Sequence, residues 1–178
     1  MNKSFFLTIV LFIIPVSLMA QTNQKPCNCC TPEYRQFDFW IGDWEVYDPD
    51  GNLVGTNVIE LQQDSCMLKE NWIGTSGGTG TSFNYYDKKT KKWNQLWLNN
   101  SGGNLKLSGV YSNNNMVLES DEMYSEKHKT YYKDRITWTN NTDGTVKQHW
   151  QRTQDKGKTW TTVFIGLYKQ KANHSKQQ

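Results

Sequence analysis

The stretch Phe37–Trp44 reads Phe-Asp-Phe-Trp-Ile-Gly-Asp-Trp and opens a series of short segments in which apolar and polar residues alternate. Alternation with a period of two is typical of β-strands that have one buried face. About ten such segments follow one another, and none has the spacing of a helix. A Gly-x-Trp step on a first strand, followed only by hairpins, is typical of a small closed β-barrel. The sequence therefore predicts an all-β fold, a single antiparallel up-and-down barrel of about ten strands.

Turn residues separate the expected strands, as in Asp48-Pro49-Asp50-Gly51 and Ser101-Gly102-Gly103-Asn104. Gly, Pro, Asn and Asp favour tight connections, and their regular spacing favours a meander over βαβ units. Phe37–Trp40 is expected to form a tight turn that plugs one end of the barrel. The expected strands are Trp44–Tyr47, Leu53–Gln62, Cys66–Ile73, Thr81–Tyr86, Trp93–Leu98, Leu105–Tyr111, Met116–Ser120, Tyr131–Thr139, Val146–Arg152 and Trp160–Lys169.

The first twenty residues have the pattern of a secretory signal peptide. Lys3 supplies the basic region, Phe5–Ile14 the apolar region, and Leu18-Met19-Ala20 the small-residue cleavage site. The apolar region is too short for a membrane-spanning helix. The expected organisation is a signal peptide over residues 1–20, an irregular Cys-containing arm over 21–36, a barrel domain over 37–171 and a frayed tail over 172–178.

Cleavage after Ala20 would leave 158 of the 178 residues, enough for one domain, and would lower the net charge from +3 to +2. We expect an exported protein, periplasmic or extracellular. It is not expected to be a lipoprotein, because the first cysteine, Cys27, does not follow the cleavage site directly. We expect no nucleic-acid partner, since no clustered basic face is present. The outer strand faces are too polar for lipid, so no membrane span is expected after cleavage.

The chain has four cysteines, an even number at low density. Cys27, Cys29 and Cys30 precede the expected barrel, and Cys66 lies on an expected strand. One or two disulfides that anchor the N-terminal arm are expected in an exported protein, with Cys66 as a candidate partner. A thiolate site for Cu(I) or Zn is the alternative. No second Cys-x-x-Cys or His-x-x-His accompanies the cluster, so no metal is predicted.

The predicted inner faces mix aromatic and polar side chains, as Trp72 with Glu70 and Trp97 with Gln95 illustrate. Burial of an unpaired polar group costs several kcal/mol, whereas ligand pockets have aromatic walls with a few placed polar groups. The alternative is that the polar groups satisfy one another or bind trapped water. The sequence predicts a cavity for a small organic ligand. The expected ligand-binding residues are Glu70, Trp72, Asn84, Gln95, Trp97, Arg135, Gln148 and Trp150.

The segment Thr153–Trp160 matches the Asp-box pattern S/T-x-D-x-G-x-T-W. Asp155 can accept hydrogen bonds from turn amides, Gly157 permits a positive φ, and Trp160 can fold back over the hairpin. Sialidases repeat this box around a propeller and use an arginine cluster, whereas this chain has a single box. We therefore interpret it as a stabilising hairpin.

Five motifs occur in a characteristic order along the chain: Phe37–Trp44, Leu68–Trp72, Trp93–Trp97, Arg135–Trp138, and Gln148 through Phe164–Tyr168. In this order, over about residues 33–169, the chain resembles a bacterial family of secreted calycin-like barrel proteins, with a shape similar to lipocalins and nitrobindins. Gly42-Asp43-Trp44 is similar to the lipocalin signature in which the Trp seals the closed end. The resemblance implies a fold and no particular activity.

We expect a binding protein with no cofactor and no catalytic residue. Heme in a nitrobindin-like barrel needs an axial His inside, and His149 alternates with the inward-facing Trp150. An enzyme that uses Glu70 as acid or base is one alternative, because desolvation in an aromatic cavity would raise its pKa. In this setting Arg135 could pair with Glu70 and fix an anionic ligand. A carbohydrate or protein interaction module with exposed Trp side chains is the other alternative.

Overall fold

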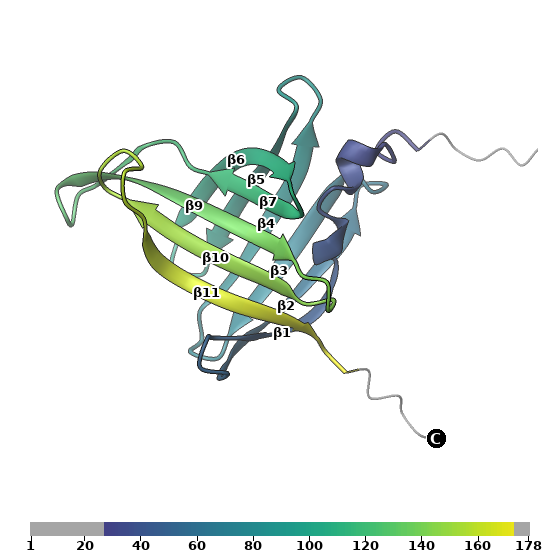
Figure 1. Ribbon diagram of the computed structural model, residues 1–178, viewed down its shortest axis with the longest axis horizontal. Helices are drawn as coiled ribbons and strands as arrows, with labels where there is room; N and C mark the ends of the chain where they lie inside the picture. The colour runs from purple at the N-terminus through teal and green to yellow at the C-terminus, as the bar shows by residue number, and fades with distance from the viewer. Residues whose placement is uncertain (1–26, 173–178) are drawn as a thin grey trace, which may run out of the picture.

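The computed structural model describes residues 27–172, and its regular structure consists of β-strands with two short 3-10 segments (Figure 1). The 3-10 segments are η1 (Pro32–Arg35) and η2 (Asp38–Trp40). The strands are β1 (Gly42–Tyr47), β2 (Leu53–Gln62), β3 (Met67–Gly74), β4 (Thr79–Asp87), β5 (Lys92–Asn99), β6 (Asn104–Ser112), β7 (Asn115–Glu119), β8 (Met123–Ser125), β9 (Thr130–Asn140), β10 (Val146–Thr153) and β11 (Thr161–Gln170).

Ten of these strands form a closed antiparallel barrel. Each strand from β1 to β6 pairs with the next, β7 pairs with β9, and β9, β10 and β11 follow in order. β11 returns to β1 with Trp44 opposite Gln170, which closes the sheet. The predicted up-and-down barrel is therefore confirmed, and closure removes the free edges that an open sheet would expose.

The structure contains two short elements that the sequence analysis did not identify. The three-residue strand β8 was not predicted; it pairs only with β9 and forms a hairpin arm beside the barrel. A three-residue segment is too short for alternation to be recognised. In the arm expected to be irregular, residues 32–35 form η1, which begins with Pro32 at a first helical position, where a fixed φ is favourable.

The segment around η2 plugs one end of the barrel, as the residue pattern of Phe37–Trp40 indicates. The side chains of Phe37 and Trp40 are fully buried and stack with ring centroids 4.9 Å apart. Phe37 also contacts Trp93 and Trp138 edge-on, at 5.6 and 5.3 Å. The indole nitrogen of Trp44 donates to the carbonyl of Trp40 at 2.9 Å, so the Gly-x-Trp step holds the plug in place.

Two disulfides secure the chain before the plug. Cys29 is joined to Cys66, next to β3, and Cys27 is joined to Cys30. All four cysteines are oxidised, so they are not available as the thiolate metal ligands considered above. The Cys29–Cys66 bond fixes the N-terminal segment to the plugged end of the barrel.

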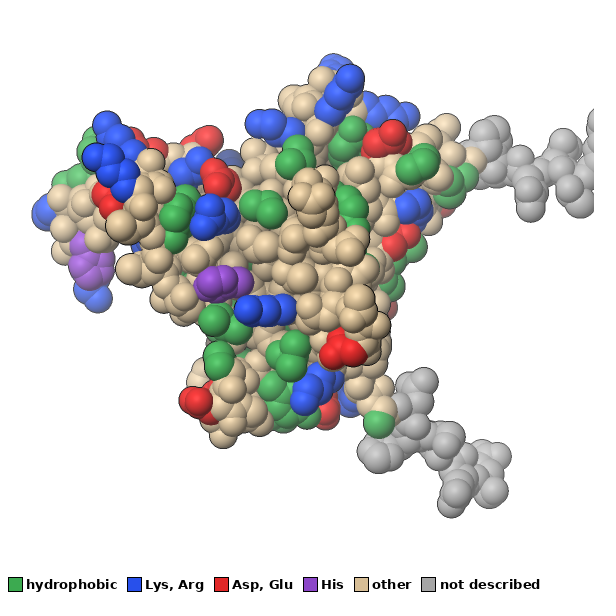
Figure 2. Space-filling view, viewed as in Figure 1, with side chains coloured by type: hydrophobic (Ala, Val, Ile, Leu, Met, Phe, Trp, Pro, Cys, Tyr) green, Lys and Arg blue, Asp and Glu red, His purple; other side chains and the backbone are tan. Residues whose placement is uncertain are grey.

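On the face seen in Figure 2, several Lys and Arg side chains gather on the projecting hairpins, and others are scattered over the barrel wall. Figure 2 shows such a cluster on a projecting hairpin, where Figure 1 places the turn between β4 and β5. Over residues 27–172 the chain contains no helix with the length and apolar character needed to cross a membrane.

Candidate functional site

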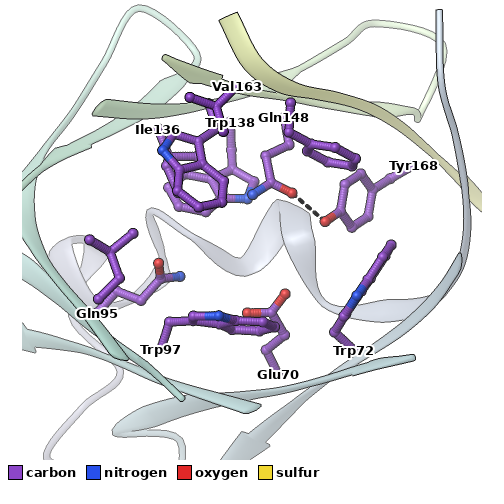
Figure 3. Close-up of a pocket in the computed structure, with 12 residues that line it drawn as sticks. Glu70, Trp72, Gln95, Trp97, Ile136, Trp138, Gln148, Val163 and Tyr168 are labelled. Atoms are coloured by element: carbon purple, nitrogen blue, oxygen red, sulfur yellow. Dashed lines mark hydrogen bonds between the residues drawn. The ribbon is translucent and has the colours of Figure 1, made fainter. Parts of the chain in front are cut away.

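A cavity of about 230 Å³ lies inside the barrel above the plug. It is larger than an engineered cavity of about 150 Å³ that holds a benzene molecule. Its wall consists of aromatic and aliphatic side chains with three polar residues among them (Figure 3). The lining residues are Glu70, Trp72, Gln95, Trp97, Leu105, Ile136, Trp138, Gln148, Trp150, Val163, Phe164 and Tyr168.

The cavity opens at the barrel end opposite the plug. Here we use "aromatic rim" for four half-buried side chains, those of Trp72, Trp97, Trp150 and Phe164. Trp72 and Trp97 lie toward the ends of β3 and β5, whereas Trp93, which contacts the plug, lies at the beginning of β5. Adjacent strands run in opposite directions, so Phe164 near the beginning of β11 belongs to the same end. The aromatic rim therefore borders the entrance.

Glycines on neighbouring strands make room for the aromatic rim. A Cβ added to Gly80 would lie 2.2 Å from the Trp97 ring, and one added to Gly55 would lie 2.4 Å from the Trp72 ring. Both distances are far below van der Waals contact, so each indole lies flat on the backbone of the adjacent strand. These glycines fix the position of the rim.

Glu70 is the acidic group of the cavity and is 5 % exposed. On β3 it lies directly opposite Ser82 of β4. On the other side its direct partner on β2 is Ile59, and Asn57 lies two residues from Ile59 on the same strand. The amide nitrogen of Asn57 donates to Oε1 of Glu70 at 2.7 Å, and the hydroxyl of Ser82 donates to Oε2 at 2.6 Å. Each carboxylate oxygen therefore has one protein donor and keeps capacity for another.

The hydrogen bonds continue from Glu70 in two directions. On one side Asn84 donates to the Ser82 hydroxyl at 2.8 Å, and Gln95 donates to the Asn84 carbonyl at 2.8 Å. On the other side the Asn57 amide lies 3.3 Å from the Tyr168 hydroxyl, which donates to Gln148.

A single polar network thus crosses the barrel from β5 to β10. Its members are Gln95, Asn84, Ser82, Glu70, Asn57, Tyr168 and Gln148. In the low dielectric of the interior such a network holds its members in defined positions.

Burial raises the pKa of Glu70 to about 7, because desolvation disfavours the carboxylate more than the hydrogen bonds from Ser82 and Asn57 favour it. Desolvation also raises the pKa of the Tyr168 phenol well above its usual value, and the nearby Glu70 carboxylate adds to this effect. Tyr168 is therefore neutral near pH 7, where Glu70 exchanges its proton.

Polar atoms of the network remain free to contact a ligand. The carbonyl oxygen of Gln95 and the amide nitrogen of Gln148 have no hydrogen-bond partner among the described residues, although both residues line the cavity. The buried indole nitrogens of Trp138 and Trp150 also lack a partner within that part of the chain. The cavity can therefore present an amide acceptor, an amide donor and a carboxyl group to one small molecule.

The structure brings six of the eight predicted binding residues to the cavity and places two elsewhere. Asn84 is buried behind the wall, where it connects Gln95 to Ser82. The prediction for Arg135 is wrong: its neighbours Ile136 and Asp134 are buried on the inner side, so alternation directs Arg135 outward. Its guanidinium stacks 3.9 Å above the Trp160 ring and does not pair with Glu70.

Arg135 instead lines a second pocket, of about 420 Å³, beside the Asp-box turn. In that turn the carboxylate of Asp155 accepts hydrogen bonds from the backbone and hydroxyl of Thr159 at 2.9 and 2.6 Å. These bonds lower the pKa of Asp155 to about 2. Gly157 has a φ of +88° and lies under Trp160. The geometry is that of a stabilised hairpin.

Several site residues were not recognised from the sequence. Tyr168 and Trp138 line the cavity, and Asn57 and Ser82 hold the carboxylate. A usable signal exists for Tyr168, which alternates with Gly166 and Phe164 on an expected strand. Asn57 and Ser82 are identifiable only from the pairing register, which a single sequence does not reveal.

The fold and the site together define a closed up-and-down barrel with a polar and aromatic cavity. Within residues 27–172 no three His, Cys, Asp or Glu side chains come together in an arrangement that could hold a metal ion. His149 lies 3.0 Å from the Thr162 hydroxyl and is not part of the cavity wall. Comparison of the chain with protein-family models and with curated proteins finds no match.

Proposed function

We propose that this protein binds a small organic molecule inside its barrel. The observation that carries the proposal is the polar network facing an aromatic-walled cavity. Burial of a polar atom without a hydrogen-bond partner costs free energy, and here Gln95 and Gln148 each keep one such atom at the cavity, where a ligand can pair with it. Ligand pockets combine such placed polar groups with apolar walls.

Export and a calycin-like relationship belong to the same proposal. The signal-peptide pattern of residues 1–20 supports a periplasmic or extracellular location, although these residues lie outside the described part of the chain. The closed ten-stranded meander with a Trp beside the plugged end supports a place among calycin-like barrels. In the periplasm or outside the cell, a binding barrel would encounter its ligand outside the cytoplasm.

An enzyme is the second candidate, and the observation that favours it is the pKa of Glu70, raised to about 7. A general acid or base works best when its pKa is near the working pH. Glu70→Gln would then keep the substrate bound and abolish turnover. Turnover that persists in this variant would exclude Glu70 as the catalytic group.

The proposal is tested by native mass spectrometry of the protein purified from its own host. We expect an additional mass that disappears on denaturation. Trp97→Ala should remove that mass, because the indole forms part of the aromatic rim. Trp160→Ala is the matched control, since Trp160 stacks on Arg135 outside the cavity.

The two variants separate binding inside the barrel from adhesion to its surface. Loss of the additional mass in the Trp160 variant but not in the Trp97 variant would contradict an internal site. A clean mass for the wild-type protein, together with no binding of any small molecule in the probe experiment below, would refute the proposed function.

A further inference from the structure

The side chains that line the cavity include an acidic group and no basic group. Glu70 and Tyr168 are the titratable residues among those that line it, and none of the lining residues is basic. β10 carries one arginine, Arg152, opposite the buried Asp134, and its guanidinium donates to both carboxylate oxygens of Asp134 at 2.7 and 2.9 Å. The Glu70 carboxylate therefore has hydrogen-bond donors but no cationic partner within the described structure.

A buried carboxylate without a cation is unfavourable, and a bound cation removes this cost. The hydrogen bonds from Asn57 and Ser82 are neutral and compensate only in part, as the position of the Glu70 pKa shows. An anionic ligand would add a second negative charge to the same low-dielectric space. Charge complementarity therefore favours a positive ligand.

The wall adds a second, independent preference for positive charge. Trp72, Trp97, Trp138, Trp150, Phe164 and Tyr168 surround the cavity. The faces of aromatic rings carry partial negative charge, and rings arranged as a cage attract ammonium groups, most strongly when water is excluded. In Figure 3 Trp72 and Trp97 lie on either side of the Glu70 carboxylate, which points into the cavity.

We propose that the cavity binds a small organic cation, with an ammonium group placed between the Glu70 carboxylate and the aromatic wall. This inference rests on the proposed function and names the class of ligand. The volume of about 230 Å³ exceeds that of a cavity of about 150 Å³ that holds benzene, which suits a compact amine or quaternary ammonium compound rather than a lipid or a tetrapyrrole.

Binding of such a cation is linked to the proton on Glu70. The groups that face Glu70 from the packed strands are Asn57 of β2, Ser82 of β4 and Tyr168 of β11, and of these Tyr168 alone can titrate. Its pKa is raised well above the usual value, so it stays neutral. A permanent cation should therefore bind about tenfold more weakly for each pH unit below about 7 and reach a plateau above it.

The test uses two probes of nearly the same shape, benzyltrimethylammonium and its uncharged carbon isostere neopentylbenzene. Affinities are measured by Trp fluorescence and calorimetry on the full mature protein. We expect the cation to bind more tightly than the isostere. Glu70→Gln should weaken cation binding roughly ten- to a hundredfold and leave the isostere unaffected. Glu60→Gln is the matched control, because Glu60 is exposed on β2 and loses the same charge.

The outcomes distinguish the ligand class from the proposed function. Equal or tighter binding of the isostere, competing with the cation for one site and abolished by Trp97→Ala, would overturn the cation inference and leave the binding function intact. Cation binding that is unchanged in Glu70→Gln, or constant between about pH 5 and pH 8, would also overturn it. Failure of both probes to bind would count against the cation inference and, with a clean native mass, against the binding function.

Discussion

Replacement of Glu70 by Gln should change how the stability of the protein depends on pH. Gln has the shape of Glu and can accept from Asn57 through its amide oxygen, while its amide nitrogen donates to the Ser82 hydroxyl, which reverses the direction of that bond and keeps both contacts. The variant differs chiefly in having no proton to lose. The effect on the free energy of unfolding can therefore be derived from the pKa alone.

The pKa of Glu70 rises from 4.5 in the unfolded chain to about 7 in the barrel. Because the folded pKa is the higher one, the group favours folding fully below pH 4.5, and this contribution is lost as the pH rises through about 7. Each pKa unit corresponds to about 1.36 kcal/mol, so the wild-type protein should lose about 3 kcal/mol that Glu70→Gln retains.

Urea unfolding of both proteins at about pH 4 and about pH 8 measures this difference. We expect the stability of Glu70→Gln relative to wild type to be higher by about 3 kcal/mol at the upper pH. Glu60→Gln should show no such change, since Glu60 is exposed on β2. A difference between wild type and Glu70→Gln that is the same at both pH values would refute the reasoning.

Three further predictions concern stability and use urea unfolding. Gly80→Ala should cost about 1–3 kcal/mol, because its Cβ would overlap the aromatic rim, whereas Gly78→Ala, with open space around it, should be neutral; equal effects would contradict this account. Asp134→Ala should cost about 2–3 kcal/mol by leaving its arginine partner unpaired, and a neutral result would show that the pair contributes nothing. Replacing Cys29 and Cys66 together by Ser should cost about 4 kcal/mol, since their bond closes a loop across a sequence separation of 37; no loss would refute the loop-closure argument.

Most of the barrel could be predicted because its strands follow the two-residue period closely. Leu53–Gln62 was predicted with its observed bounds, and the other nine barrel strands differ by one or two residues at their ends. Alternation also placed Glu70 and Trp72 on one inner face, as found. The two-residue alternation does not reveal which residue on the neighbouring strand each residue pairs with.

The missed features of the site reflect this lack of register. The carboxylate of Glu70 is held from two neighbouring strands by Asn57 and Ser82, and nothing local in the sequence connects those three residues. Arg135 shows the other failure. It lies next to Ile136 on β9, and adjacent residues of a strand face opposite sides of the sheet. An error of one residue in assigning the inner face therefore places Arg135 in the cavity instead of on the outer surface.

Pairing of β11 with β1 also determines when the site can form during folding. Trp44 and Gln170 are 126 positions apart, so we expect their contact to form late, after the hairpins between successive strands. Phe164 and Tyr168 belong to β11, so the wall of the cavity is incomplete until β11 pairs with β1. A ligand that requires the whole wall therefore binds only the closed barrel. It should slow the opening of the barrel without accelerating its folding.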